Sequence, residues 1–565
     1  MTFSIMNRTL LVSIALISGL SASAQKLNCK ERKALKQVRA DITYLASDEL
    51  MGRATGTEGE HMSAYYIADA FRRNKLEPKG NDGYFQKFTI TTLRIADGKS
   101  QFTLNGENFR LFKDYYPLSY SSNGGEFDGV VVNAGFGIAS DKRNDYEGKD
   151  VEGKAVLINI GSPDGIHPHS AYLAWHGLSV RVDEAVKRGA KAVFFYRANE
   201  KVEKPKGELS LTMEPSSVPV VFIDRVLEDV DYFKSIDLSL KVLVDQDTAY
   251  NVVGFKDNGA EHTVILGAHH DHLGMGQHGN SLAKNTNEIH NGADDNASGT
   301  SGLIVLSKWL KKSKKWNKNN NYLFIAFSGE EMGLLGSKYF VKHPTIDLNT
   351  ANYMLNMDMI GVLTQEKGLI VNGVGTNSMF ESMLDSLVKE DSRIAKLETT
   401  KSGIGRSDHT SFYLQKMPVM HFFTGAHEHY HKPSDDVEIV NDSGVVYVLS
   451  VMRDVIARLN TEGKLEYVKT KDETKQSRRM KFEVTLGVVP NYSYDGEGME
   501  LDAVREGKTG QAAGLKAKDV IVSFGGKNIK NIQDYMAVLG ELKKGSQTTV
   551  VVRRDGELVT LNVQF

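Results

Sequence analysis

Continuous runs of apolar residues constrain this chain more than any other feature of its sequence. Such runs occupy residues 264–268, 322–327 and 419–423. A strand with one face in water alternates apolar and polar residues, whereas a continuous apolar run is typical of a strand buried on both faces. A segment with helical spacing of apolar residues, 303–310, lies between two of these runs. Residues 251–465 therefore predict an α/β domain, with a mixed sheet covered by helices on both faces.

The rest of the chain reads as further segments around this domain. A chain of 565 residues is too long for a single hydrophobic core. Residues 42–88 have the pattern helix, turn, helix and strand. Residues 125–244 contain short apolar strands separated by turns, with one helix expected at 180–189, and they indicate an inserted, mostly-β domain. Residues 469–481 are charged and have almost no apolar side chains, which is typical of a linker. The segment after this linker is long enough to fold as a small domain of its own.

The first residues have the pattern of an export signal. Asn7 and Arg8 precede a short apolar run at 9–20, and Ala24 ends an A-x-A sequence. This pattern predicts a signal peptide that is cut after Ala24. The run is shorter than the roughly 20 residues that a membrane-spanning helix needs, and no later segment is long and apolar enough. We therefore expect an exported protein, periplasmic or secreted, without a stable membrane span; the sequence does not distinguish these two destinations.

Net charge and cysteine content exclude two further possibilities. The formal net charge is -2, which offers no electrostatic reason to expect a nucleic acid as a partner. Cys29 is the only cysteine, so the chain cannot form an internal disulfide. Stability must therefore come from packing and from bound metals.

Five short segments within residues 251–465 carry side chains that bind metals. The side chains of interest are His269, Asp271, Asp294, Asp295, Glu330, Glu331, Asp358 and His431. Each segment taken singly also fits a simpler explanation, such as an acid that compensates the dipole of a helix. Together, and each near the end of an expected strand, they indicate a ligand site at the carboxyl edge of the sheet.

The spacing within two of these segments suggests different tasks for neighbouring residues. On a strand, residues i and i+2 face the same way, so Asp271 can hydrogen-bond the ring of His269. Such a bond fixes the tautomer of a histidine that binds zinc. On a turn or a starting helix, neighbours point roughly 100° apart. One of Glu330 and Glu331 can therefore bind a metal while the other faces the attacking water.

The order of the motifs H-x-D, G-A-D-D-x-A-S-G, G-E-E-x-G, N-M-D-M and Y-H-x-P-x-D resembles that of the M28 family of zinc aminopeptidases. The resemblance covers residues 42–88 and 251–465 and implies the zinc-aminopeptidase fold. It also implies two Zn²⁺ ions per chain, held by five ligands. One ion would be bound by His269 and Asp358, the other by Glu331 and His431, and both by a bridging Asp294.

The same resemblance implies roles for residues around the metals. Glu330 would be the general base, Asp271 the partner of the His269 ring, and Asp295 the far side of an unusual cis peptide. Tyr430 stands where some members of the family have a tyrosine that stabilises the oxyanion. The implied function is that of an exported di-zinc metallo-aminopeptidase, an exopeptidase that hydrolyses N-terminal residues from peptides with free N-termini. Neither the preferred N-terminal residue, the peptide length nor the oligomeric state follows from the sequence.

Two other functions remain possible on the same fold. The first is a glutaminyl-cyclase-like transferase, which uses a single zinc. The second is a non-catalytic binding protein that has kept the fold. The presence of all five ligand positions and of Glu330 disfavours both. Metal content per chain distinguishes the three functions: the aminopeptidase requires two zinc ions, the transferase one and the binding protein none.

Two further segments resemble known domains. Residues 125–244 resemble the protease-associated (PA) domain, through the stretches 187–193 and 218–221. The C-terminal segment resembles a PDZ domain, in which 486–490 would hold a carboxylate; Lys518 replaces a usual glycine. A PDZ domain adds an extended C-terminal peptide to a sheet edge. The expected boundaries are a signal peptide at 1–24, the first part of the catalytic domain at 25–120, the PA domain at 121–246, the metal-binding core at 247–467, a linker at 468–481 and the PDZ domain at 482–565.

Overall fold

A computed structural model describes most of the chain, in two units, Met1–Thr470 and Lys471–Phe565. The described residues are 27–166, 170–200, 202–211, 213–227, 230, 233–277, 280–283, 287–366, 368–390, 393–470, 484–490, 498–504, 508–529, 532–554 and 556–565. The predicted signal peptide at 1–24 and most of the predicted linker lie outside these ranges. Within them, every helix is too short or too polar to cross a membrane.

A mixed sheet forms the centre of the first unit, and its middle strands include the apolar runs of the sequence. Four parallel neighbours lie in the order β18–β15–β13–β14. Antiparallel strands flank them on both sides, and every residue of β14 and β15 is buried. The bounds are β12 Ser235–Lys256, β13 His262–His269, β14 Asn320–Phe327, β15 Ala351–Met357, β16 Leu369–Asn372, β17 Leu397–Thr400 and β18 Val419–Phe423.

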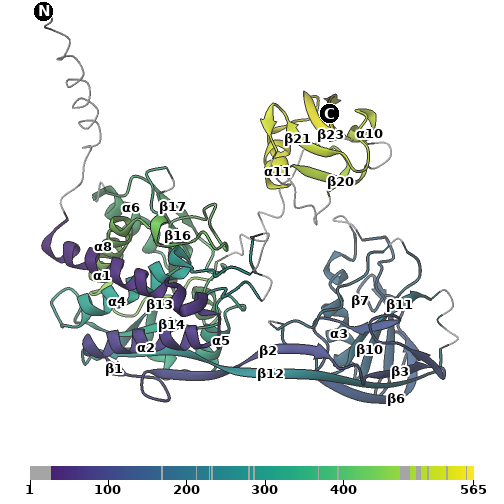
Figure 1. Cartoon of the computed structure of the whole chain (residues 1–565), viewed down its shortest axis with the longest axis horizontal. Coiled ribbons are helices and arrows are strands. Elements are labelled where there is room, and N and C mark those ends of the chain that lie inside the picture. Colours follow the sequence, from purple (N-terminus) through teal and green to yellow (C-terminus); the bar gives the residue numbers. More distant parts are fainter. Residues whose placement is uncertain are drawn as a thin grey trace, which may run out of the picture. The chain divides into compact units, whose positions relative to one another are not determined.

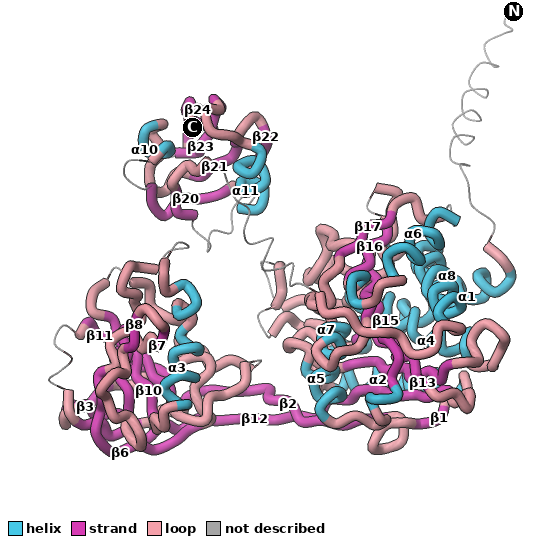
Figure 2. Tube along the Cα trace, turned by 180° about the vertical axis from the view of Figure 1, so that it is seen from behind, coloured by secondary structure: helices cyan, strands magenta, loops and turns pink. Residues whose placement is uncertain are grey.

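Helices cover both faces of this part of the sheet, which confirms the predicted fold class (Figure 2). Alternate residues of one strand enter different cores: Leu266 packs in the core on one face and Ile265 in the core on the other. The first face carries α1 Cys29–Leu45, α2 Glu58–Arg73, α4 Gly299–Leu310, α6 Phe380–Glu390 and α8 Asp442–Leu459. The second carries α5 Leu335–Lys342 and α7 His409–Tyr413.

The long strand β12 joins the central sheet to an inserted β-rich region. One end pairs with β14 and the other with β6 and β3, while β2 follows it in between (Figure 1). The region has its own apolar cores, and the helix expected at 180–189 is present as α3. Its elements, with β2, are β2 Phe85–Ala96, β3 Gln101–Leu104, β4 Glu107–Phe109, β5 Tyr115–Pro117, β6 Gly124–Asn133, β7 Ala139–Ser140, β8 Arg143–Asn144, β9 Ala155–Asn159, α3 Leu178–Lys187, β10 Ala192–Arg197 and β11 Val220–Val226.

The inserted region begins earlier than the sequence suggested. Strand β5 pairs with β11, and β3 pairs with β12. Both β3 and β5 were expected in the first part of the catalytic domain, at 25–120. Their strand partners place them in the inserted region instead. Identity as a PA domain stays a prediction.

The second unit is a small sheet with a core of its own. Its strands lie in the order β19–β20–β21–β23–β24, with β22 paired to β21, and its apolar side chains form a separate cluster. The bounds are β19 Val488–Pro490, β20 Met499–Val504, α10 Thr509–Ala512, β21 Val520–Phe524, β22 Lys527–Asn528, α11 Ile532–Glu541, β23 Gln547–Arg554 and β24 Glu557–Gln564.

Candidate metal centre

The predicted site residues lie at one edge of the central sheet. His269 is the last residue of β13, Glu330 follows β14, and Asp358 follows β15 directly. His431 lies in the loop after β18. Because these four strands are parallel, their carboxyl ends meet at the same edge, which is where open α/β sheets bind ligands.

Two groups of metal-ligand side chains lie at this edge, and they share one residue. His269, Asp295 and Asp358 form one group, and His272, Asp295 and Glu331 form the other; the ligand atoms of each lie within 4.8 Å of one another. Oδ1 of Asp295 lies 3.3 Å from Nε2 of His269. Oδ2 of the same carboxylate lies 3.3 Å from Nε2 of His431. Asp295 thus turns one oxygen to each half of the site.

This geometry corrects the prediction for Asp294. Its carboxylate faces away from both groups: Oδ1 accepts a hydrogen bond from the backbone N–H of Gly361 at 2.6 Å, and Oδ2 lies 3.1 Å from the ring of His427. The cis peptide bond joins Asp295 to Asn296, so Asp295 is on its near side. Successive side chains in this turn point in different directions. The sequence of two adjacent aspartates therefore does not indicate which of them faces the site.

A third carboxylate, Asp435, holds this turn in place. Its Oδ1 accepts from the backbone N–H of Asp294 at 2.9 Å, and its Oδ2 accepts from that of Asp295 at 3.0 Å. Burial raises the pKa of Asp435 to about 6. The sequence segment 429–436 contained this residue, but nothing in the spacing distinguished it from Asp436, which caps the next short helix.

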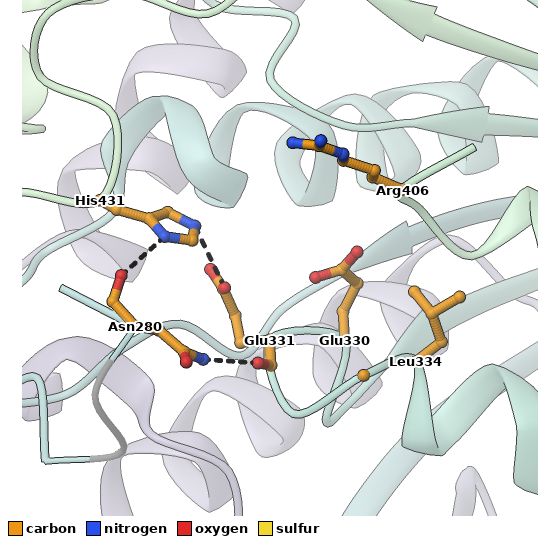
Figure 3. A pocket seen from close by; sticks show the side chains of 7 residues that line it. Asn280, Glu330, Glu331, Leu334, Arg406 and His431 are labelled. Atoms are coloured by element: carbon orange, nitrogen blue, oxygen red, sulfur yellow. Dashed lines mark hydrogen bonds and ion pairs between the residues drawn. The ribbon is translucent and has the colours of Figure 1, made fainter. Parts of the chain in front are cut away.

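Both predicted histidine ligands present the same ring nitrogen to the carboxylates. Nδ1 of His431 lies 2.9 Å from the carbonyl oxygen of Asn280, and its Nε2 lies 3.2 Å from Oε2 of Glu331 (Figure 3). Nδ1 of His269 lies 3.1 Å from the carbonyl oxygen of Asp271, and its Nε2 lies 3.3 Å from Oδ1 of Asp358. A carbonyl on Nδ1 fixes the tautomer that leaves Nε2 for a metal. Imidazole nitrogens among carboxylates are a donor set that suits zinc.

Asp271 and His272 complete the surroundings of these ligands. The carboxylate of Asp271 lies 3.6 Å from Nδ1 of His269, farther than a hydrogen bond. It accepts from the hydroxyl of Thr55 at 2.8 Å and from the backbone N–H of Glu330 at 3.2 Å. Sequence reasoning missed His272, whose Nδ1 lies 2.8 Å from Oε1 of Glu331. The signal was present, since His272 belongs to the same motif segment as His269.

A pocket of about 470 Å³ opens over the site (Figure 3). It is lined by Asn280, Glu330, Glu331, Leu334, Arg406 and His431, together with Gly333. Desolvation raises the pKa of Glu330 well above its ordinary value, and the carboxylates of Asp358 and Glu331 act in the same direction against the opposing charge of His269. A divalent cation among these acids would offset that repulsion.

Tyr430 lies beside the site. Its ring stacks on that of His431, with 3.9 Å between the ring centres. Burial, helped by the negative charges of Asp295 and Glu331, raises the pKa of Tyr430. The phenol therefore keeps its proton at neutral pH and can donate a hydrogen bond.

Comparisons with known proteins agree with this geometry. Residues 251–456 match peptidase family M28, and residues 484–565 match the PDZ domain. Aminopeptidase YwaD of Bacillus subtilis is 26% identical over 448 residues, which cover 77% of this chain and 87% of that protein. A probable leucine aminopeptidase of Arthroderma otae is 31% identical over 182 residues, 31% of this chain and 46% of that protein. The chain therefore spans less than half the length of this fungal relative.

Solved structures of related proteins include an aminopeptidase from Aneurinibacillus sp. strain AM-1. It is 22% identical, covers 78% of this chain and 96% of its own, and superimposes with a TM-score of 0.47. The candidate metal ligands all lie within the stretch that matches the peptidase family. The metal-binding segment of this chain thus belongs to peptidase family M28, and its C-terminal unit is a PDZ domain.

Proposed function

We propose that this chain is an exported aminopeptidase that uses two zinc ions to hydrolyse the N-terminal residue from peptides. The observation that carries the proposal is the position of Asp295, whose two carboxylate oxygens face two separate sets of metal-ligand side chains. Membership of family M28 and the aminopeptidase names of its relatives support the reaction class. Export rests on the sequence pattern of residues 1–24.

The first proposed ligand set is the group of His269, Asp295 and Asp358; in the second set His431, whose Nε2 lies 3.2 Å from Oε2 of Glu331, takes the place of His272. His269 and Asp358 would hold one ion, Glu331 and His431 the other, and Asp295 both. His272 would orient Glu331 through its bond to Oε1. A pair of zinc ions bound there supplies an activated water and polarises the scissile carbonyl.

Protein groups perform the proton transfers. Glu330 lines the pocket, and its raised pKa suits a group that takes a proton at neutral pH. It receives the proton of the attacking water and returns it to the nitrogen of the leaving amine. The phenol of Tyr430 donates a hydrogen bond to the carbonyl oxygen as negative charge develops there.

The two alternatives on this fold make different demands on the metal site. A glutaminyl-cyclase-like transferase needs a single zinc, and a binding protein needs none. The two-sided arrangement around Asp295 favours two ions over either alternative. We also propose that the inserted β-rich region is a PA domain and that the PDZ domain binds the C-terminus of a peptide.

The test is hydrolysis of leucine p-nitroanilide and of its N-acetylated form by the purified full chain. We expect release of nitroaniline from the free substrate only, its loss after treatment with a chelator, and its recovery after addition of zinc. Equal turnover of the acetylated substrate would contradict exopeptidase specificity. Activity that survives complete removal of metal would contradict the metal mechanism.

A further inference from the structure

Arg406 is a charged residue of the pocket that the proposed mechanism does not use. It lies in the loop between β17 and α7 and is exposed, whereas the residues that follow it, 407–409, are buried. Figure 3 shows its side chain entering from the side opposite the loop of Glu330 and Glu331, with the guanidinium end turned into the open space above them. It therefore faces any substrate bound over the metal ligands.

Two of the other ionisable residues of the pocket, Glu331 and His431, already have partners. Glu331 contacts His272 and His431, and His431 also contacts Asp295. Glu330 lines the pocket with Arg406, but no ion pair joins the two. Across the described parts of the chain, the guanidinium of Arg406 has neither an ion pair nor a hydrogen bond, so its charge and its donors are available to a ligand.

The charge of the pocket makes this arginine stand out. The two proposed zinc ions would offset the negative charges of Glu330, Glu331, Asp295 and Asp358. Among the lining residues of the described chain, Arg406 is the only one with a permanent positive charge. A guanidinium binds a carboxylate through two parallel hydrogen bonds, a geometry that few other groups match.

We propose that Arg406 forms a carboxylate subsite for the part of the peptide beyond the scissile bond. The substrate class is then short peptides, whose free C-terminal carboxylate lies only one or two residues from that bond. A pocket of about 470 Å³ is within the range that encloses small ligands. The inference rests on the proposed aminopeptidase function and deepens it, because it names the end of the substrate that the enzyme recognises besides the N-terminus.

Matched dipeptides test the subsite. Leu-Leu and its C-terminal amide differ only in the carboxylate, and Leu-Asp-amide and Leu-Asn-amide differ only in a side-chain carboxylate. We expect the full zinc-loaded chain to prefer Leu-Leu over its amide. In Arg406→Gln this preference, as a ratio of kcat/KM values, should fall about tenfold, mainly through KM, as for loss of one charge-assisted contact.

Two further variants control for charge alone. Arg406→Lys keeps the positive charge and should restore part of the preference. Lys389→Gln removes one positive charge from the exposed end of α6 and should leave the preference as in the wild type. The affinity of Leu-Leu for the Glu330→Gln variant, measured by calorimetry with and without the additional Arg406→Gln substitution, reports on the same contact in the absence of turnover.

The possible outcomes distinguish a failure of the Arg406 subsite from a failure of the proposed aminopeptidase function. If Arg406→Gln lowers only the preference for Leu-Asp-amide over Leu-Asn-amide, Arg406 binds an acidic side chain, and the proposed recognition of a free C-terminus is overturned. If Arg406→Gln changes neither ratio nor the calorimetric affinity, the subsite is overturned, although wild-type hydrolysis of Leu-Leu-amide still supports an aminopeptidase. If the zinc-loaded wild type hydrolyses none of these peptides, the proposed function itself fails.

Discussion

At the scale of single residues, two adjacent aspartates have separate tasks. The carboxylate of Asp295 faces the metal-ligand side chains on both sides, whereas that of Asp294 hydrogen-bonds the backbone and Ser298. Both are buried, and both carry the same chemistry. Their difference is one of direction, which the turn between Gly292 and Asn296 decides.

Substitution of each aspartate by asparagine should have different effects. Asp295→Asn removes the shared anionic ligand and should lower zinc content towards none, with loss of activity. Asp294→Asn keeps a carbonyl acceptor and should retain the metal, with stability lowered by about 1–3 kcal/mol for the weakened buried contacts. Metal analysis and thermal unfolding of the two purified variants measure this. Metal loss from Asp294→Asn alone would restore the assignment made from the sequence.

The sequence predicted which segments build the site, but not every side chain within them. His269, Glu330, Glu331, Asp358 and His431 meet because parallel strands end together, and strand ends can be read from apolar runs. The choice between Asp294 and Asp295 depends on local dihedral angles. The contact of His272 with Glu331 depends on how two loops pack. Neither the dihedral angles nor the packing of loops produces a periodic pattern in the sequence.

At the scale of elements, a single arginine ties together the loops of the site. Arg53 ends the short helix Asp48–Arg53 and is fully buried. Its guanidinium donates to the carbonyl oxygens of His270 at 2.9 Å, Asn291 at 2.7 Å and Gly292 at 3.0 Å, and also to that of Leu45. One of these acceptors, the carbonyl oxygen of Gly292, lies 239 residues away along the chain. No sequence pattern predicts such a contact.

We expect Arg53→Lys to loosen both loops, since one ammonium group cannot reach four carbonyl oxygens. Each buried carbonyl left without a donor costs about 1–3 kcal/mol. The melting temperature should therefore fall by several degrees, and zinc affinity should fall with it. Arg188→Lys is the control, because Arg188 pairs with Glu184 at the surface, where such pairs contribute little. Equal melting temperatures for the two variants would show that Arg53 does not organise the loops.

At the scale of the whole molecule, the chain consists of two units with separate cores. The apolar cluster of the PDZ domain contains only residues after 483, and the clusters beneath the metal site contain only residues before 468. The first unit was predicted as an α/β domain with an insertion, because strands alternate with helices in 251–465, whereas residues 125–244 contain short apolar strands separated by turns. The start of the insertion was not foreseen, since β3 and β5 join it through long-range pairing.

Removal of residues 471–565 should leave the metal site working. Among the described residues, the apolar cores of the first unit have no member after residue 470, so those cores stay complete when the PDZ domain is removed. Zinc content and turnover of leucine p-nitroanilide by the shortened chain should match those of the full chain within about twofold. This range corresponds to the roughly 0.5 kcal/mol by which independent sites depart from additivity. Loss of both would show that the PDZ domain supports the catalytic fold.

The most direct test of the account is the zinc content of Glu330→Gln and Glu331→Gln, measured beside their activity. Glu331 is proposed to bind a metal and Glu330 to carry a proton, although they are neighbours in sequence. We predict that the wild type holds two zinc ions per chain and that Glu331→Gln holds fewer. Glu330→Gln should keep both ions and lose about 10²–10⁴-fold in kcat, the usual contribution of general acid–base catalysis. Full metal in Glu331→Gln, or near-wild-type activity in Glu330→Gln, would contradict the proposed mechanism.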